Sequence, residues 1–465
     1  MKKKIKVPHT YIILLGIALI MCILTWIIPA GEFDTKEIGD RTVAIGGSFH
    51  YVERNPQNLW QFFTSVFEGL VQTANISLFI FIVGGAFHVI NETETIKASI
   101  SKLTKSLKDK EMLVVPIFLL VFAIAGSTIG LSEETIVFIP VGIILAKSLG
   151  FDAMIGMSMI TLGAGIGFSA GFMNPFSTGV AQEIAELPFT SGIWYRAIVL
   201  VVLWIVTSIY MTNYARKIKK DNSNSYLWND FKGSFEVNSE IKEVEEDEEF
   251  DFRKKLILFS ILIAFIAIAI GASKLGWFIN EIASVFLILC FVSGLIGGFS
   301  PSMIADKFIE GAKDMVFSAL VVGFARSILV VMENGLIIAT IINFLSNLIS
   351  TLPKTIGALG MYIVQIILNF FIPSGSGQAA ATMPIMTPLA DSLDITRQTA
   401  VLAFQFGDGF TNSIIPTSGT LMAQLAIAKI PYNKYAKFVA KLMALWIIIG
   451  MIFVIIATLI EYGPY

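Results

Sequence analysis

The stretch Pro373-Ser-Gly-Ser-Gly-Gln-Ala-Ala-Ala-Thr-Met-Pro384 lies between two apolar segments, 355–372 and 397–406. It brings two glycines, two serines, a glutamine and two prolines into a hydrophobic part of the chain. Non-helical backbone is tolerated at membrane depth only where it is buried in protein or lines a water-filled cavity. The stretch therefore predicts a break in helical structure and a candidate binding site.

A second interrupted segment occurs in the first half of the chain. The sequence Gly126-Ser-Thr-Ile-Gly-Leu-Ser-Glu-Glu-Thr135 separates two apolar runs and is followed by Pro140. Two interrupted hydrophobic segments at corresponding positions in two halves of a chain are typical of a transporter substrate site. We therefore expect both stretches to contact one small-molecule substrate.

The composition is that of an integral membrane protein. Of the 465 residues, 55% are hydrophobic and 15% are charged, whereas about one quarter of an average soluble chain is charged. No basic surface favours a nucleic-acid partner, and the lipid bilayer is the expected surrounding. Cys22 and Cys290 lie in apolar runs without metal-ligand spacing, so both are predicted to be small buried hydrophobic side chains.

The N-terminus is predicted to lie in the cytoplasm. Four lysines in Met1-Lys-Lys-Lys-Ile-Lys6 precede the first apolar run at 11–28, and lysines gather on the cytoplasmic side of membrane proteins. The run has no small-residue cleavage pattern, so we interpret it as an uncleaved span. The protein is expected to cross the cell (plasma or inner) membrane many times, with its C-terminus outside.

Apolar segments predict the remaining crossings. Residues 112–147 are apolar at both ends and broken at 126–134. Because two full crossings need about forty apolar residues, this segment fits a re-entrant helical hairpin better, and 355–391 predicts a second one. Amphipathic segments at 93–107, 301–312 and 335–350 are expected at the interface or as short helices. Single crossings are expected at 67–90, 153–172, 193–212, 256–272, 278–298, 313–331, 397–413 and 437–460.

The two halves of the sequence repeat. Trp204 matches Trp446 at an offset of 242 residues (446 minus 204), and Pro140 matches Pro384 at 244 (384 minus 140). The segment 278–298 has no partner in the first half. Because one unpaired crossing inverts everything after it, the first hairpin is predicted to open from the cytoplasm and the second from outside. This arrangement is an inverted-topology repeat, which is typical of secondary transporters.

One polar stretch, 216–255, divides the repeats. Its middle, Glu243-Val-Glu-Glu-Asp-Glu-Glu249, is a block of like charge and is predicted to be a solvated cytoplasmic linker. The predicted organisation is a first repeat at 1–215, which contains the N-terminal span and the cytoplasm-facing hairpin, and a second repeat at 256–465. The second repeat contains the extra span and the outside-facing hairpin.

Three acidic residues lie at or beside the breaks. Glu133 and Glu134 follow the first turn, and Asp408 lies within Gly407-Asp-Gly409. A charged acid inside the membrane costs roughly 2.5–3.5 kcal/mol on insertion scales, so it indicates function. These acids could bind a cationic substrate group, a sodium ion or a proton. The alternative is that a glutamate caps the helix that starts after Ser132.

Hydroxyl groups and backbone amides at the breaks complete the predicted site. Carbonyl and hydroxyl oxygens suit sodium, and amide donors at helix N-termini suit a substrate carboxylate. The alternative for each hydroxyl is local capping. Besides Glu133 and Glu134, the candidate substrate-binding residues are Ser127, Thr128, Asn174, Ser374, Gly375, Ser376, Gly377, Gln378, Asn412, Thr417 and Ser418. The candidate ion-coupling residues are Asp408, Ser127, Ser376, Gly407 and Gly409.

Several motifs resemble those of the YfcC family of membrane proteins, which is grouped with anaerobic C4-dicarboxylate carriers and ArcD-like basic amino acid antiporters in the ion transporter superfamily. The motifs are Val7-Pro-His-Thr10, Ile28-Pro-Ala-Gly-Glu-Phe33, Gly126–Glu134, Pro373-Ser-Gly-Ser-Gly-Gln-Ala379 and Gly407-Asp-Gly-Phe-Thr-Asn412. The resemblance implies a scaffold domain, a transport domain with two opposed hairpins, and a homodimer that works by an elevator mechanism.

The acidic first break favours an amino acid substrate. Carboxylate recognition beside an acid suits a zwitterionic or cationic amino acid, so we expect arginine/ornithine-like antiport or ion-coupled uptake. The alternative is a sodium- or proton-coupled transporter of C4-dicarboxylates or short peptides. Neither a His or Cys constellation nor a Walker-type loop occurs, so no enzyme, cofactor or nucleotide-driven pump is predicted; the coupling ion is expected to be Na⁺ or H⁺.

Overall fold

The computed structural model describes residues 10–38, 41–96, 98–99, 110–189, 191–228, 251–275 and 277–463. Within these ranges nine helices are long and apolar enough to cross a membrane, as the composition predicts. They are α1 (Thr10–Ile27), α3 (Ala74–Glu92), α5 (Val114–Ile129, preceded by the 3-10 turn η1, Glu111–Leu113), α7 (Ala153–Ala170), α9 (Ile193–Lys220), α12 (Ile279–Ile296), α14 (Val316–Asn334), α16 (Lys354–Phe371) and α20 (Tyr432–Leu459).

The other helices of the described residues complete the fold. They are α2 (Leu59–Gln72), α6 (Ile139–Ser148), α8 (Thr178–Ile184), α11 (Phe252–Lys274), α13 (Pro301–Asp314), α15 (Ile338–Ile349), α17 (Gly375–Ser392), α18 (Arg397–Asn412) and α19 (Gly419–Ile427), with the 3-10 turns η2 (Glu133–Phe138) and η3 (Asn222–Asn224). The predicted crossing at 67–90 is in fact two helices, α2 and α3, that meet at Thr73.

Four short strands lie between α1 and α2, within residues 31–51. β1 (Gly31–Glu32) pairs antiparallel with β4 (His50–Tyr51), and β2 (Thr35–Ile38) pairs antiparallel with β3 (Arg41–Ala44). The register joins Gly31 to Tyr51 and Thr35 to Ala44. β3 packs against α17, so this segment of the first half reaches the second half of the chain.

α9 is longer than the predicted crossing at 193–212. Its last turn carries Lys217, Lys219 and Lys220, and cations at a helix C-terminus interact favourably with the helix dipole. Most of the predicted acidic linker (229–250) and much of the predicted interfacial segment at 93–107 fall outside the described residues.

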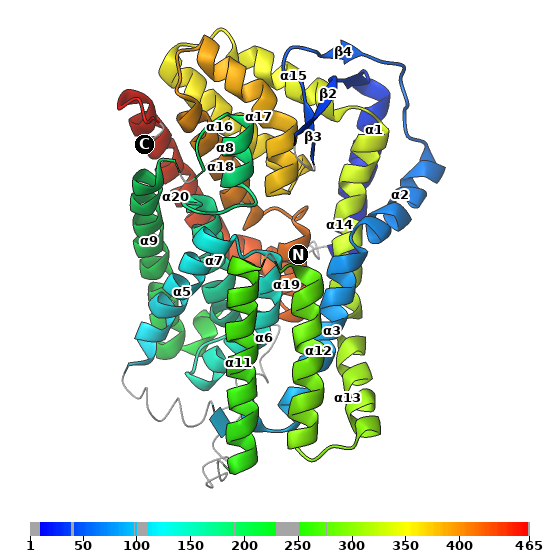
Figure 1. The fold of residues 1–465 in the computed structure, drawn as a ribbon, viewed down its shortest axis with the longest axis vertical. Coiled ribbons are helices and arrows are strands. Elements are labelled where there is room, and N and C mark those ends of the chain that lie inside the picture. Colours follow the sequence, from blue (N-terminus) through cyan, green and yellow to red (C-terminus); the bar gives the residue numbers. More distant parts are fainter. Residues whose placement is uncertain are drawn as a thin grey trace, which may run out of the picture.

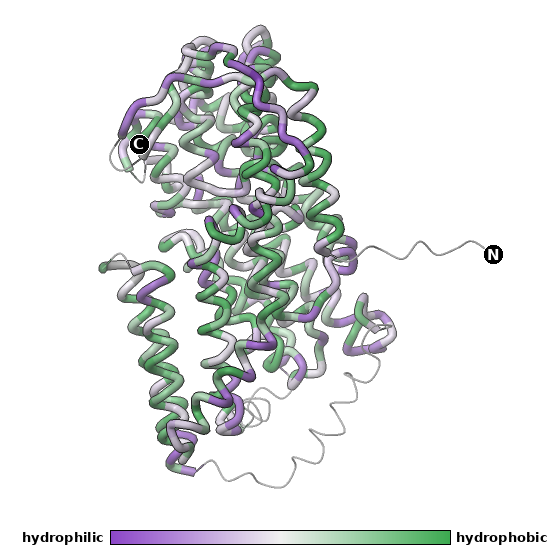
Figure 2. Tube along the Cα trace, turned by 90° about the vertical axis from the view of Figure 1, so that its right-hand side faces the viewer, coloured by the Kyte–Doolittle hydropathy of each residue, from purple (hydrophilic) through white to green (hydrophobic). Residues whose placement is uncertain are grey.

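The helices form two groups, which we name the panel and the core. Figure 1 shows the panel on the right and lower centre and the core on the left. Figure 2, which views the molecule from the right-hand side of Figure 1, shows hydrophobic residues along most of these helices. The panel consists of α1, α2, α3 and α11–α14, and the core consists of α5–α9 and α16–α20.

Two antiparallel helix pairs in the core point at each other. In Figure 1 the pair α5 and α6 lies below mid-height and the pair α16 and α17 lies above it. α7 packs on the first pair, α18 packs on α16 and α17, and α7 and α18 contact each other. The turns at 130–132 and 372–374, and the non-helical stretches 171–177 and 413–418, therefore meet in one region.

Glycines allow the panel helices to approach closely. A Cβ on Gly69 of α2 would lie 2.5 Å from the Gly323 carbonyl oxygen of α14, and a Cβ on Gly311 of α13 would lie 2.6 Å from the Gly84 carbonyl oxygen of α3. Small residues at helix contacts are the usual means of close packing in membranes. The α2–α14 and α3–α13 contacts are thus of the same kind, and each joins a helix of the first half of the chain to a helix of the second half.

Acidic side chains close the ends of these contacts. The Asn334 Nδ2 donates to Glu68 Oε2 (3.1 Å), and the Lys307 Nζ donates to Glu92 Oε2 (2.5 Å). The His88 Nε2 lies 3.6 Å from Glu310 Oε2. These contacts place Glu68, Glu92 and Glu310 between panel helices.

We expect Gly69→Ala to destabilise the protein by about 1–3 kcal/mol, because the new methyl group meets backbone atoms of α14 that cannot move aside independently. Gly16→Ala in α1 is the matched control, since a Cβ there has no neighbour within 4 Å. Thermal unfolding of the purified variants measures the effect. Equal unfolding temperatures for the two variants would contradict the close α2–α14 contact.

Candidate functional site

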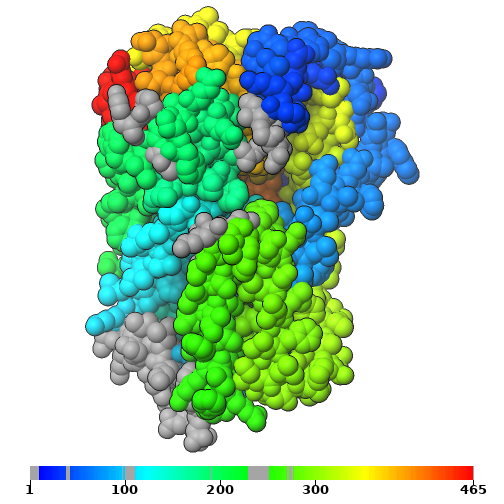
Figure 3. Space-filling view, in the orientation of Figure 1, coloured from blue at the N-terminus to red at the C-terminus, as the bar shows by residue number. Residues whose placement is uncertain are grey.

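A cavity of about 380 Å³ lies between the panel and the core. Its panel wall includes Thr73, Ile76, Phe278 and five residues of α14, namely Val322, Ala325, Arg326, Ile328 and Leu329. Its core wall includes residues of the two turns, of the two non-helical stretches and of α7, α18 and α19. Figure 3 shows a hollow at mid-height on the viewed face, above the upper ends of α11 and α12. Every break in the core helices thus contributes to one cavity.

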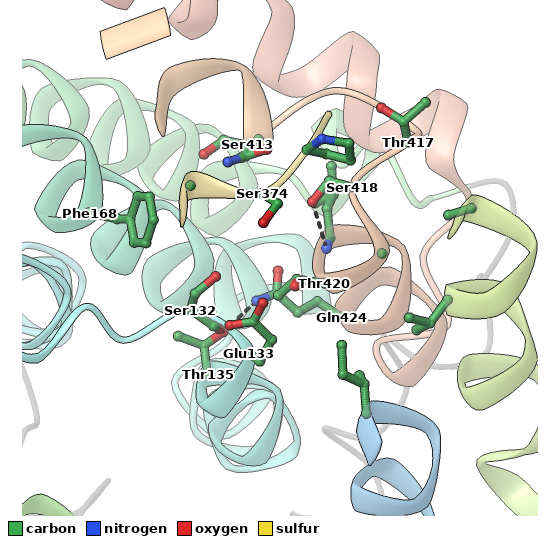
Figure 4. Close-up of a pocket in the computed structure, with 18 of the residues that line it drawn as sticks. Ser132, Glu133, Thr135, Phe168, Ser374, Ser413, Thr417, Ser418, Thr420 and Gln424 are labelled. Carbon is green, nitrogen blue, oxygen red and sulfur yellow. Dashed lines mark hydrogen bonds between the residues drawn. The ribbon is translucent and has the colours of Figure 1, made fainter. Parts of the chain in front are cut away.

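The first turn brings two glutamates to this cavity. Gly130 ends α5 with a φ of +66°, a conformation that suits glycine, and a Cβ there would lie 2.7 Å from Asn174 Oδ1. The Ser132 amide donates to Glu134 Oε2 (3.1 Å). The Glu134 carboxylate therefore caps the start of η2, which is the alternative role predicted for these glutamates. Glu133 lies beside Thr420 in the close-up view (Figure 4).

A chain of three side chains, which the sequence analysis missed, holds this turn in place. The Thr161 hydroxyl donates to Gln424 Oε1 (3.0 Å), and Gln424 Nε2 donates to Thr135 Oγ1 (2.5 Å). The Thr135 hydroxyl in turn donates to the Ser132 carbonyl. The network joins α7, α19 and η2, and all three side chains line the cavity. A signal was available: Gln424 repeats Gln182 at the offset of 242 residues (424 minus 182).

The second turn presents the N-terminus of α17. Ser374 caps this helix by accepting a hydrogen bond from the Gly377 amide (3.3 Å), and α17 already begins at Gly375. The break is therefore shorter than the stretch 373–384 suggests. Pro384 lies inside α17, where the run of alanines that precedes it favours helix.

α19 presents a second helix N-terminus to the same cavity. Ser418 caps it by accepting from the Leu421 amide (3.4 Å), and Figure 4 shows Ser374 and Ser418 on neighbouring parts of the cavity wall. Free amide groups and the helix dipole make such N-termini favourable for anions.

The structure separates the predicted site residues into two sets. The residues that line the cavity are Glu133, Glu134, Ser374, Gly375, Ser376, Gly409, Asn412, Thr417 and Ser418. The residues that do not line it are Ser127, Thr128, Asn174, Gly377, Gln378, Gly407 and Asp408.

Local hydrogen bonds account for several residues of the second set. The Ser127 and Thr128 hydroxyls donate to the Ile124 carbonyl within α5, at 2.9 and 2.7 Å. The Gln378 Nε2 donates to Gln365 Oε1 on α16 (2.7 Å). Asn174 Oδ1 accepts from the amide of Phe176 (2.9 Å) in its own loop.

Asp408 is buried behind the cavity wall. Its Oδ1 accepts from Asn412 Nδ2 (3.0 Å), and Asn412 Oδ1 accepts from Asn369 Nδ2 (3.0 Å). Its Oδ2 has no hydrogen-bond partner. Because Asn412 lines the cavity, one side chain separates Asp408 from it.

Arg326 is the basic residue of the cavity wall. Arg326 forms an ion pair with Glu333, with 3.4 Å between Arg326 Nη2 and Glu333 Oε1. The Arg326 Nε also donates to Gln72 Oε1 (2.7 Å) on α2. Among the described residues, no group of three or more His, Cys, Asp or Glu side chains is placed to hold a metal ion.

Two solved structures share the general arrangement only weakly. Neisseria gonorrhoeae MtrF has a TM-score of 0.43 and 14% identity, over 98% of this chain and 96% of that chain. The Alcanivorax borkumensis YdaH transporter has a TM-score of 0.41 and 13% identity, over 97% of this chain and 98% of that chain.

Sequence comparison is more specific. A protein of Escherichia coli (strain K12) named "Putative basic amino acid antiporter YfcC" is 33% identical over 494 residues, which cover 98% of this chain and 97% of the relative. An uncharacterized Haemophilus influenzae protein is 30% identical over 504 residues, with the same coverage. The model of the DcuC family, described as "C4-dicarboxylate anaerobic carrier", matches residues 7–459. The chain belongs to the DcuC family and is a multi-pass membrane transporter of the DcuC/YfcC type.

Proposed function

We propose that the protein is a secondary active transporter of the cell membrane that moves an amino acid with a second cationic group, such as arginine or ornithine. The observation that carries this proposal is the composition of the cavity wall: two helix N-termini and two glutamates face one space. Its volume of about 380 Å³ falls within the usual range for small-molecule sites, about 300–1,000 Å³.

The N-termini of α17 and α19 would bind the substrate carboxylate. Ser374 and Ser418 use their side chains to cap these helices, so the remaining first-turn amides are the donors for a ligand. Ser376 and Thr417 add hydroxyl groups on the same wall. Pre-positioned donors of this kind bind an anion without reorganisation.

Glu133 and Glu134 would bind the cationic groups. The two carboxylates are adjacent in sequence and repel each other, which a cationic ligand relieves. Glu134 is already held by the Ser132 amide, so we assign the direct contact to Glu133. Thr161, Gln424 and Thr135 would act by orienting this turn.

A C4-dicarboxylate is the second candidate substrate, and Arg326 on the cavity wall favours it. The family description names this substrate class. A doubly negative ligand would meet Glu133 and Glu134 unless sodium ions or protons neutralised them. The name of the E. coli relative supports an amino acid substrate. Short peptides are the remaining substrate class that the sequence left open.

We propose alternating access of the elevator type, which the positions of the two groups of helices support. The cavity lies between them, so movement of the core along the panel would carry a substrate. The opposed α5–α6 and α16–α17 pairs support the inverted repeat (Figure 1). The basic ends of α9 and α11 point toward the lower end of that figure, which supports a cytoplasmic lower face. The C-terminus outside and the homodimer stay predictions.

Substrate class is tested by counterflow in proteoliposomes. We expect vesicles preloaded with arginine or ornithine to accumulate labelled arginine, because exchange needs no other driving force. Succinate and fumarate in the preload serve as the dicarboxylate arm. Exchange with succinate and none with arginine would replace the first candidate substrate with the second.

We expect Glu133→Gln to weaken arginine binding by about 10- to 100-fold, the loss of one charge-assisted hydrogen bond. Citrulline, which has the same shape without the charge, should lose much less. Calorimetric titration of the purified variants measures both affinities. Glu53→Gln in the exposed loop is the matched control. A parallel loss for arginine and citrulline would remove Glu133 from cation recognition.

A further inference from the structure

A set of buried polar side chains lies behind the cavity, and we name it the polar seam. It consists of five residues, none more than 2% exposed: Asn174, Ser177, Thr178, Gln405 and Asp408. Each has a buried side-chain atom without a hydrogen-bond partner, namely Asn174 Nδ2, Ser177 Oγ, Thr178 Oγ1, Gln405 Oε1 and Asp408 Oδ2. Unsatisfied polar atoms are rare in protein interiors, so the four oxygen atoms of this set indicate a missing partner. Asn174 Nδ2 is a hydrogen-bond donor and is not a ligand for a cation.

The seam residues border two glycines, Gly375 at the N-terminus of α17 and Gly171 at the end of α7. A Cβ on Gly375 would lie 3.3 Å from Asp408 Oδ2 and 2.9 Å from Ser177 Cβ, so both side chains border the same space. Gln405 and Asp408 are three residues apart on α18 and share a helix face. Thr178 and Gln405 both border Gly171, at the end of α7.

The charge of Asp408 has no positive partner among the described residues. The charged group that acts on it is Glu133, which has the same sign. An unpaired carboxylate in a protein interior is strongly unfavourable, so Asp408 requires either a proton or a cation. A proton would occupy one oxygen atom, whereas a small cation would be bound by several at once.

We propose that the polar seam binds a sodium ion through Asp408 Oδ2, Ser177 Oγ, Thr178 Oγ1 and Gln405 Oε1. Hard cations prefer oxygen ligands from carboxylates, hydroxyls and amides, and the single carboxylate suits a monovalent ion. Ser127 and Ser376 are the hydroxyl residues predicted from the sequence to act with Asp408 in this role. The structure favours Ser177 instead, because Ser127 is bonded within α5 and Ser376 faces the cavity.

Asn412 would link this ion to the transported substrate. Its Nδ2 holds Asp408 Oδ1, and its side chain lines the cavity. Occupation of the seam would fix the Asn412 side chain and with it one wall of the cavity. This link rests on the proposed function, whereas sodium binding by the seam does not.

The test measures thermal unfolding of the full-length, substrate-free protein in sodium, potassium and choline chloride at equal ionic strength. We expect saturating sodium to raise the unfolding temperature by about 3 °C or more over choline. Ser177→Ala should shift the sodium dependence to roughly tenfold higher concentration. Asp408→Asn should abolish it. Ser293→Ala in α12 is the matched control, because it also removes a buried hydroxyl without a partner.

Equal unfolding temperatures in all three salts would overturn the proposal, and so would an unchanged sodium dependence in Ser177→Ala. A series at several pH values separates the two cations: stabilisation by acid without any sodium effect would assign the seam to a proton. Ser177→Ala keeps the test valid if Asp408→Asn does not fold. Arginine counterflow with sodium present on both sides of the membrane reports separately on the proposed function.

Discussion

The fold depends on the hydrogen-bonding needs of the backbone where helices break in apolar surroundings. Four breaks occur in the core, at 130–132, 171–177, 372–374 and 413–418, and each leaves amide and carbonyl groups that lipid cannot satisfy. The structure brings all four together. Side chains such as Ser374 and Ser418 satisfy some of these groups, and the cavity leaves the others available to a ligand. The backbone groups that the breaks leave without partners are therefore the groups that would bind the substrate.

The distribution of charge across this region suits a ligand that carries both a negative and a positive group. Helix N-termini supply partial positive charge on the α17 and α19 side, and Glu133 and Glu134 supply negative charge on the α5–α6 side. Among the described residues, Arg326 does not neutralise the two glutamates of the cavity, because it is engaged by Glu333 and Gln72. The polar seam adds a third centre behind the wall, connected through Asn412. Such an arrangement favours a substrate and an ion that bind together.

Much of the architecture could be predicted from the sequence, because apolar length and interrupting residues report directly on membrane helices. The predicted crossings at 11–28 and 153–172, for example, follow from such local patterns and correspond to α1 and α7. The strands at 31–51 and the division at Thr73 did not, since both depend on contacts with distant helices. Ser127 and Thr128 were placed at the cavity, whereas their hydroxyls bond to the Ile124 carbonyl within α5, which is the local alternative that the sequence left open. Gln424 was missed because its signal is the repeat of Gln182 in the other half of the chain and not a local pattern.

The most direct test is a structure of the protein determined with arginine bound in lipid nanodiscs. The account predicts ligand density in the cavity between the panel and the core, with its carboxylate at the N-termini of α17 and α19 and its guanidinium beside Glu133. Density that contacts only one of the two turns, or that lies outside this cavity, would contradict the claim that both halves of the chain build a single substrate site.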